Sequence, residues 1–212
     1  VKEVQKSGVI AILRKVPAPA VIPVIDALIE GGIRVLELTV ESRGALANLE
    51  KAVNERSDQV LIGAGTVLDA ATAKAAIAAG AEFIVTPTLN VEVIETAHRY
   101  GKAVFPGAFT PTEILTAYEA GAEAVKVFPA QMLGPDYLKQ LKGPLGHIPL
   151  VPTGGVDANN AGAYIRAGAF AVGVGGSLID KDAVERGQFQ VITRKAQALV
   201  EAVEQALRSR GS

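Results

Sequence analysis

The sequence predicts a closed barrel of eight parallel strands surrounded by helices, a (β/α)8 (TIM) barrel, in a single domain over residues 1–212. Four similar segments carry this prediction, at 30–40, 78–88, 119–129 and 166–176, and each has a glycine followed by a nearly continuous apolar run. Such runs are typical of parallel strands covered by helices. The expected strand ends are spaced by about 20–26 residues, which leaves room for one helix and two short loops. An open doubly wound sheet is the alternative, because periodicity alone does not show closure.

The elements follow from these patterns in chain order. The eight strands are expected to end near Arg14, Val40, Thr66, Thr86, Pro106, Phe128, Pro152 and Val174. Between them, helical patterns cover 19–32, 69–80 and 110–121, and the final helix is expected over Phe189–Leu207. In the third of these patterns Thr110 is a cap, Pro111 takes the first helical position and Glu113 completes a capping box.

Composition limits the class of protein. Hydrophobic residues make up 49% of the chain and aromatics 5%, with no Trp, so the core must be Ala, Val, Ile and Leu. A net charge of −1 gives no broad attraction for nucleic acid or an anionic membrane, so neither is an expected partner. We find no membrane-spanning apolar run and no signal peptide. The absence of Cys excludes disulfides and thiolate metal sites and is compatible with a cytoplasmic location.

A lysine within an apolar strand is the first functional signal. Successive side chains of a strand point to opposite faces, so Val125 and Val127 share one face while Lys126 and Phe128 share the other. The outer face of a barrel strand packs against helices and favours aliphatic residues, so Lys126 is expected to point into the barrel. The same parity turns Glu37 inward. Both residues lie toward the carboxyl ends of their strands, where barrel enzymes build their active sites.

Lys126 has two interpretations. It forms a buried ion pair with Glu37 that only fixes the interior, or it is a nucleophile. Desolvation disfavours the ammonium form, and a free amine attacks a carbonyl to form a Schiff base, an electron sink for C–C bond chemistry. We favour the nucleophile, with Glu37 either its counter-ion or the acid and base that shuttles protons. Lys102 begins its strand and is therefore read as a solvated lysine at the opposite end.

Glycine pairs follow the last two strands, in PTGGV (152–156) and GVGGS (173–177). Paired glycines let backbone N–H groups approach an anion closely, and barrel enzymes often bind phosphate at these two loops. The substrate is therefore expected to carry a phosphate or another anion distant from Lys126. The two histidines, His98 and His147, are placed on a helix and at the amino end of a strand, which argues against a His-containing metal site or a Ser-His-Asp triad.

Taken together, these motifs resemble the class I 2-dehydro-3-deoxy-6-phosphogluconate (KDPG) aldolases and the related 4-hydroxy-2-oxoglutarate (KHG) aldolases. The resemblance covers essentially the whole chain, and IGAGTVL, VKVFPA and PTGGV in that order are its specific motifs. It implies a homotrimer of (β/α)8 barrels with an extra N-terminal helix closing one end. It also implies cleavage of 2-dehydro-3-deoxy-6-phosphogluconate, a phosphorylated 2-keto acid, to pyruvate and the aldehyde glyceraldehyde 3-phosphate, with no metal or organic cofactor.

The same resemblance assigns residues to roles. Lys126 matches the Schiff-base lysine and Glu37 the proton-shuttling glutamate. The positions that match substrate-binding residues are Arg14 and Thr66 around the pyruvyl carboxylate, Pro87, Phe128 and Thr153 in the pocket lining, and Gly154, Gly155, Gly176 and Ser177 in the phosphate-binding turns. The chain departs from the family at Glu41, where many members have an Arg that helps to hold anionic substrate. Arg43, two positions on, is the candidate to replace it, and a shifted substrate preference or reduced activity is the expected consequence.

Other functions stay open at this stage. Related chemistry on 4-hydroxy-2-oxoglutarate or 2-dehydro-3-deoxy-6-phosphogalactonate is not distinguished by these residues. A different phosphate-binding barrel, such as an isomerase or epimerase, would form no covalent adduct with pyruvate. An aldolase-derived assembly scaffold with weak activity would release little pyruvate.

Overall fold

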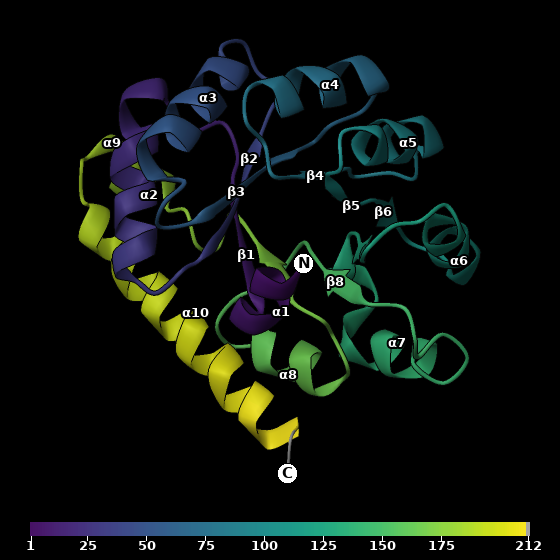
Figure 1. Cartoon of the computed structure of the whole chain (residues 1–212). Coiled ribbons are helices and arrows are strands. Elements are labelled where there is room, and N and C mark those ends of the chain that lie inside the picture. Colours follow the sequence, from purple (N-terminus) through teal and green to yellow (C-terminus); the bar gives the residue numbers. More distant parts are fainter. Residues whose placement is uncertain (211–212) are drawn as a thin grey trace.

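The computed structural model describes residues 1–210, and its strands are all paired in parallel (Figure 1). One sheet has six strands in the order β5-β4-β3-β2-β1-β9, and the second has three in the order β6-β7-β8. The strands are β1 (Val9–Leu13), β2 (Val35–Thr39), β3 (Leu61–Gly65), β4 (Phe83–Val85), β5 (Ala103–Phe105), β6 (Gly107–Ala108), β7 (Val125–Val127), β8 (Leu150–Pro152) and β9 (Val172–Val174). The predicted α/β fold with parallel strands is confirmed.

The two sheets meet at both of their edges. Only Pro106 separates β5 from β6, so one strand position is divided between the sheets. At the other edge an isolated parallel bridge joins Thr153, directly after β8, to Gly173 of β9. Proline has no N–H to donate to a ladder, which accounts for the interruption between β5 and β6.

Helices surround the strands in Figure 1, while the short α1 lies inside that ring of helices. The α-helices are α1 (Lys2–Ser7), α2 (Val21–Glu30), α3 (Ala45–Arg56), α4 (Ala70–Ala78), α5 (Val91–Arg99), α6 (Pro111–Glu119), α7 (Gly134–Leu141), α8 (Ala161–Arg166), α9 (Lys181–Glu185) and α10 (Phe189–Arg210). Two 3₁₀ turns, η1 (Ala18–Ala20) and η2 (Ala130–Met132), precede α2 and α7. Among residues 1–210, none of the helices is apolar over a length sufficient to cross a membrane.

The helix ends predicted from local sequence patterns agree closely with the structure for α6 and α10. Thr110 caps α6 by accepting from the Glu113 N–H, and the Glu113 carboxylate in turn accepts from the Thr110 N–H, which is the predicted capping box. The final helix begins at Phe189 as predicted and runs three residues further, to Arg210. The observed strands are shorter than the predicted ones. For example, Arg14, Val40 and Thr66 were predicted to end strands but lie just outside the ladders.

Two hydrophobic clusters lie on opposite faces of the strands. The larger one packs the helices against outward side chains such as Val125 and Val127. The smaller one gathers inward side chains of several strands together with Val4 of α1; its members are Val4, Ile10, Val35, Phe83, Val85, Phe105, Ala124, Val151 and Ala171. Ala124 in the inner cluster and its neighbour Val125 in the outer one confirm the predicted parity of this strand. Lys126 therefore has the inward parity.

Candidate active site

A buried lysine and a buried glutamate form the centre of the site. Lys126 and Glu37 are 3% and 2% exposed, and the Lys126 Nζ lies 3.9 Å from the Glu37 Oε1. Lys126 is on β7 and Glu37 on β2, two strands that do not pair and that belong to different sheets. The two side chains therefore meet between the two sheets, rather than along one sheet.

The Glu37 carboxylate has few polar contacts besides Lys126. Within residues 1–210, the Glu37 Oε1 is the one buried side-chain nitrogen or oxygen atom without a hydrogen-bond partner. The Lys126 Nζ lies 5.4 Å from the centre of the Phe128 ring. A Cβ on Gly65 of β3 would overlap the Glu37 carboxylate, so a glycine is needed there for Glu37 to occupy its position. A buried carboxylate oxygen whose nearest partner is a lysine at 3.9 Å, with no hydrogen bond of its own, is characteristic of a site that accepts a ligand or a proton.

A cavity of about 610 Å³ opens beside Lys126, which is the size of a small-molecule site. The predicted site residues that line it are Arg14, Lys126, Phe128, Thr153, Gly154, Gly155, Gly176 and Ser177. Glu37 and Thr66 do not line it but contact Lys126 and Arg14, respectively. Pro87, just after β4, is not among the lining residues. Parallel strands bring these residues together because their carboxyl ends meet at one edge.

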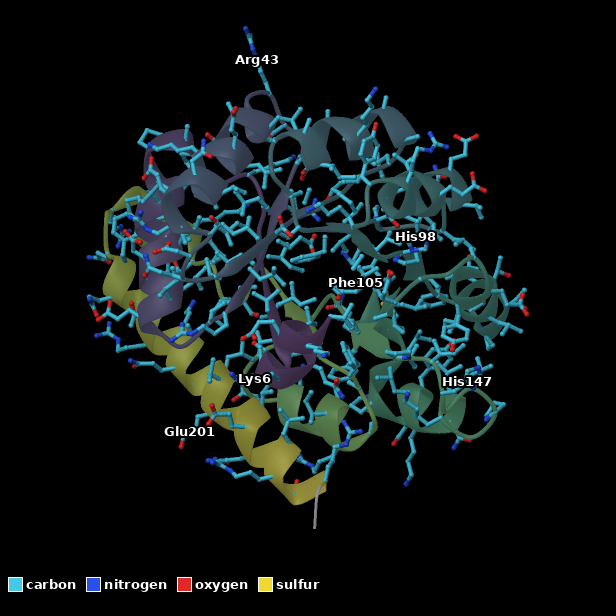
Figure 2. All side chains as sticks on the ribbon, viewed as in Figure 1. Lys6, Arg43, His98, Phe105, His147 and Glu201 are labelled. Atoms are coloured by element: carbon cyan, nitrogen blue, oxygen red, sulfur yellow. The ribbon has the colours of Figure 1, made fainter. Side chains whose placement is uncertain are left out.

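The departure at Glu41 has a structural consequence. The Arg14 Nη1 donates to the Glu41 Oε1 at 2.7 Å, and the Arg14 Nη2 donates to the Thr66 Oγ1 at 3.1 Å. Glu41 therefore binds the arginine of the site. The Arg43 side chain is exposed and extends away from the molecule (Figure 2).

The first of the two glycine turns has a backbone conformation that favours glycine. Gly154 and Gly155 have φ angles of 93° and 71°, in the left-handed region that other residues rarely adopt. The Ser177 Oγ donates to the Val156 carbonyl oxygen at 2.8 Å, which links the second turn to the first. A Cβ added to Gly176 would meet no heavy atom within 4 Å, so this turn faces open space. Both turns line the same cavity as Lys126, although they lie far from it in the sequence.

Two lysines that the sequence patterns did not single out also line the cavity. Lys15 follows Arg14, and Lys181 begins α9. The charged lining thus consists of Arg14, Lys15, Lys126 and Lys181 against one acid, Glu185. The cavity favours anions although the whole chain has a net charge of −1. Lys15 also has an uncommon backbone conformation, with a φ of 53°, and this is the structural feature that marks it as a residue of interest.

The remaining candidates lie elsewhere. His98 Nε2 lies 3.3 Å from the Glu123 Oε1, and His147 packs edge-on against Tyr118. The Lys102 Nζ lies 3.0 Å from the Glu82 Oε1, and Lys102 does not line the cavity. No cluster of three or more metal-ligating side chains occurs within the part of the chain that the structure describes.

Comparison of sequences finds relatives of this chain in one family. The sequence model of the family described as KDPG and KHG aldolase matches residues 1–195. The 2-dehydro-3-deoxy-6-phosphogalactonate aldolase of Escherichia coli (strain K12) is 37% identical over 204 residues, which cover 95% of this chain and 97% of that protein.

Solved structures with the same fold include members of this family and an assembly. The KDPG aldolase from Legionella pneumophila, with pyruvate captured as a covalent carbinolamine intermediate, superposes with a TM-score of 0.85 at 29% identity, covering 91% of this chain and 94% of that one. A cube-shaped, highly porous protein cage designed by fusing symmetric oligomeric domains superposes with a TM-score of 0.88 at 36% identity, covering 96% of this chain and 74% of that one.

Proposed function

Because the chain belongs to the KDPG and KHG aldolase family, we propose that it is a lysine-dependent aldolase that reversibly cleaves 2-dehydro-3-deoxy-6-phosphogluconate to pyruvate and glyceraldehyde 3-phosphate. The observation that carries this proposal is the buried Lys126–Glu37 pair at the inner end of a cation-lined cavity. A lysine sheltered from water beside one carboxylate has the two groups that Schiff-base chemistry needs, a nucleophile and a proton shuttle.

The reaction proceeds in balanced steps. The Lys126 amine adds to the C2 ketone, and Glu37 donates the proton that lets water leave, which gives an iminium ion. Glu37, now a carboxylate, accepts the proton of the C4 hydroxyl as the C3–C4 bond breaks, and the electron pair of that bond passes into the iminium. The aldehyde departs, leaving the enamine of pyruvate. Protonation at C3 and addition of one water then release pyruvate and restore the lysine.

The remaining residues bind the two ends of the substrate. Arg14, which Thr66 contacts from outside the cavity, holds the carboxylate next to the reacting ketone, and Phe128 and Thr153 shape the middle of the site. At the far end the backbone N–H groups of the two glycine turns, with Ser177, hold the phosphate. These turns comprise Gly154, Gly155 and Gly176. The excess of positive charge in the cavity supports a substrate with two anionic ends.

The proposed reaction needs no metal. Glu37 is a single buried carboxylate facing an amine, which is a poor donor set for a divalent cation. Dialysis against a chelator is therefore expected to leave the rate of pyruvate release unchanged, and loss of activity that returns with added divalent metal would contradict this assignment.

We further propose that the two sheets form one closed (β/α)8 barrel in a single domain, with α1 covering its amino end. The contacts at both sheet edges, the meeting of β2 and β7 side chains and the burial of Val4 in the inner cluster support this closure. The similarity to a cage designed by fusing symmetric oligomeric domains supports association of several copies, with a homotrimer as the expected state. Light scattering with size-exclusion chromatography measures that mass.

Borohydride reduction in the presence of pyruvate is the decisive experiment. We expect a stable pyruvyl adduct on Lys126, located by peptide mass mapping, and its complete loss in Lys126→Ala. Lys142 is an internal control, because burial lowers the pKa of this lysine, yet it lies outside the cavity and donates to the Ile148 carbonyl. An adduct on Lys142, or no adduct in the wild-type protein, overturns the proposal. The latter result, with normal folding, would favour a non-covalent barrel enzyme or a scaffold.

A second substrate should be compared directly, because the Escherichia coli relative is named for the galactonate epimer. The two substrates differ in configuration at one carbon. Their specificity constants, measured side by side with the same pyruvate assay, identify the preferred substrate. A phosphate-free analogue in the same assay tests the glycine turns, since equal specificity for the phosphorylated and unphosphorylated compounds would remove their assigned role.

A further inference from the structure

The carboxyl ends of β1, β2 and β3 place three polar side chains next to each other. Arg14 follows β1, Glu41 is two residues past β2, and Thr66 follows β3. The three strands are consecutive in the sheet, with Leu13 opposite Leu38 and Thr39 opposite Gly65. Neighbouring strands are about 4.8 Å apart, so Arg14 must cross the whole end of β2, roughly 9.6 Å between backbones, to reach Thr66. Its side chain is therefore held extended.

Glu41 lies at the middle of this crossing. Its Oε1 accepts from the Arg14 Nη1 at 2.7 Å, while the Arg14 Nη2 donates to the Thr66 Oγ1 at 3.1 Å. The Glu41 side chain is 19% exposed and that of Arg14 49% exposed. A half-exposed arginine without this contact would be free to occupy other rotamers, and ordering such a long side chain is entropically unfavourable. The Glu41 contact offsets that cost before any substrate arrives.

Thr66 is itself held in an unusual backbone conformation. Its φ angle is 57°, in the left-handed region that β-branched residues rarely adopt. Such conformations persist where the surrounding structure fixes them, and they concentrate at functional sites. Two contacts therefore fix the guanidinium from outside the cavity, while Arg14 also lines the cavity that contains Lys126. Arginine carries more N–H donors than these two contacts use, and the others stay available to an anion.

We infer that Glu41 is a positioning residue that pre-orders the Arg14 guanidinium for the carboxylate of the keto acid. This inference rests on the proposed function for the identity of the anion. It assigns Glu41 a role that differs from the arginine common at this position: the acid binds no substrate and acts through Arg14. The sequence alone suggested weaker binding at this position, whereas the contacts indicate an alternative way of holding the same anion.

The first test requires no activity. In the full-length protein, the Arg14 Nε–H resonance is identified by its absence from Arg14→Ala. It is expected to report an ordered side chain in the wild-type protein and in Glu41→Gln, which keeps an acceptor, and an averaged side chain in Glu41→Ala. Asp26→Ala removes the acid from the Arg56–Asp26 surface ion pair and is the matched control, expected to leave the Arg14 signal unchanged. An Arg14 signal that is equally ordered in Glu41→Ala overturns the inference.

The second test measures adduct trapping as a function of pyruvate concentration, and the rate of pyruvate release as a function of the concentration of the keto-acid substrate. Glu41→Ala is expected to raise KM by about two- to fivefold with little change in kcat, because an exposed ion pair contributes this much. Glu41→Gln should restore part of the loss. In an Arg14→Ala background the Glu41→Ala substitution should have no further effect.

The outcomes separate the two claims. A KM that falls in Glu41→Ala shows that the acid merely weakens the pull of Arg14 on the anion, and a KM that rises equally in the Arg14→Ala background shows that Glu41 acts by another route. Either result overturns the positioning role while the adduct on Lys126 still forms. Failure of the wild-type protein to form that adduct instead removes the proposed function, and the Arg14 resonance then decides the positioning claim by itself.

Discussion

Replacing Gly65 with alanine tests whether the position of the Glu37 carboxylate controls the chemistry. Gly65 ends β3 on the inward face, opposite Thr39 of β2. Its φ is outside the left-handed region, so alanine meets no backbone strain there. The added Cβ would overlap the Glu37 carboxylate and would lie 2.5 Å from its Cγ. Glu37 must therefore move relative to Lys126, while the residues that line the cavity are not themselves changed.

The size of the effect follows from that overlap. Ordinary carbon contacts begin at 3.4 Å, so the Cγ of Glu37 has to withdraw by about 0.9 Å, and the nearer carboxylate oxygen further. A misplacement of about 1 Å at a reacting group costs on the order of 100-fold in rate, or about 2.7 kcal/mol. Overpacking of the interior is expected to cost about 1–3 kcal/mol of stability.

The assay is the steady-state rate of pyruvate release together with thermal unfolding. We expect kcat to fall by about 100-fold in Gly65→Ala while the fold is retained. Removing the clashing side chain in Gly65→Ala/Glu37→Ala should restore the lost stability but not the rate. Gly143→Ala is the matched control, since its Cβ would meet only the Gln140 carbonyl oxygen at 3.4 Å. A Gly65→Ala enzyme with kcat within about threefold of the wild type would refute the reasoning.

Further substitutions test other parts of the structure. Arg43→Ala should leave KM unchanged, since that side chain extends away from the molecule (Figure 2), and a raised KM would contradict this placement. Thr110→Ala removes the cap of α6 and should cost about 1 kcal/mol, lowering Tm by about 2–4 °C. The backbone N–H groups of Phe109 and Thr110 lower the pKa of Glu113, so this carboxylate stabilises the fold above its ordinary value of 4.5 and loses that contribution as the pH falls through its folded value. Glu113→Gln should therefore destabilise the protein at neutral pH, and the difference in Tm from the wild type should shrink in acid; a constant difference would contradict the assignment. Tyr164→Phe removes the buried hydrogen bond to the Ala130 carbonyl and should cost about 1 kcal/mol in urea unfolding, and an unchanged midpoint would show that this bond contributes nothing.

Local patterns predicted most of the secondary structure because they depend on near neighbours in the sequence. The capping box of α6 involves residues three apart, and the glycine lead-ins mark chain reversals that need a positive φ. The inward parity of Lys126 follows from the alternation of side chains along a single strand. The prediction differed from the structure at the ends of elements, where Arg14 and Thr66 lie outside the ladders, and at Pro106, which divides the fifth predicted strand into β5 and β6.

The residues missed at the site have a different origin. Lys15 and Lys181 carry no periodic signal, because each is a charged residue in or beside a loop, as most lysines are. They become part of one cavity only when the segment after β1, the start of α9 and the glycine turns are brought together in the fold. Glu41 was noticed in the sequence as a departure, but its partner could not be read from its neighbours.

By itself the sequence determined the alternation of strands and helices, the face on which Lys126 lies and the positions of the two glycine turns. Each of these is set by the stereochemistry of a short segment. The sequence placed Glu37 and Lys126 on inward faces, and the tertiary structure set their separation at 3.9 Å across two sheets. Only the tertiary structure decided that Arg14 pairs with Glu41 and Thr66, which are 27 and 52 residues away. Those contacts depend on how the strands are ordered and aligned, and this order is fixed by the packing of the whole chain.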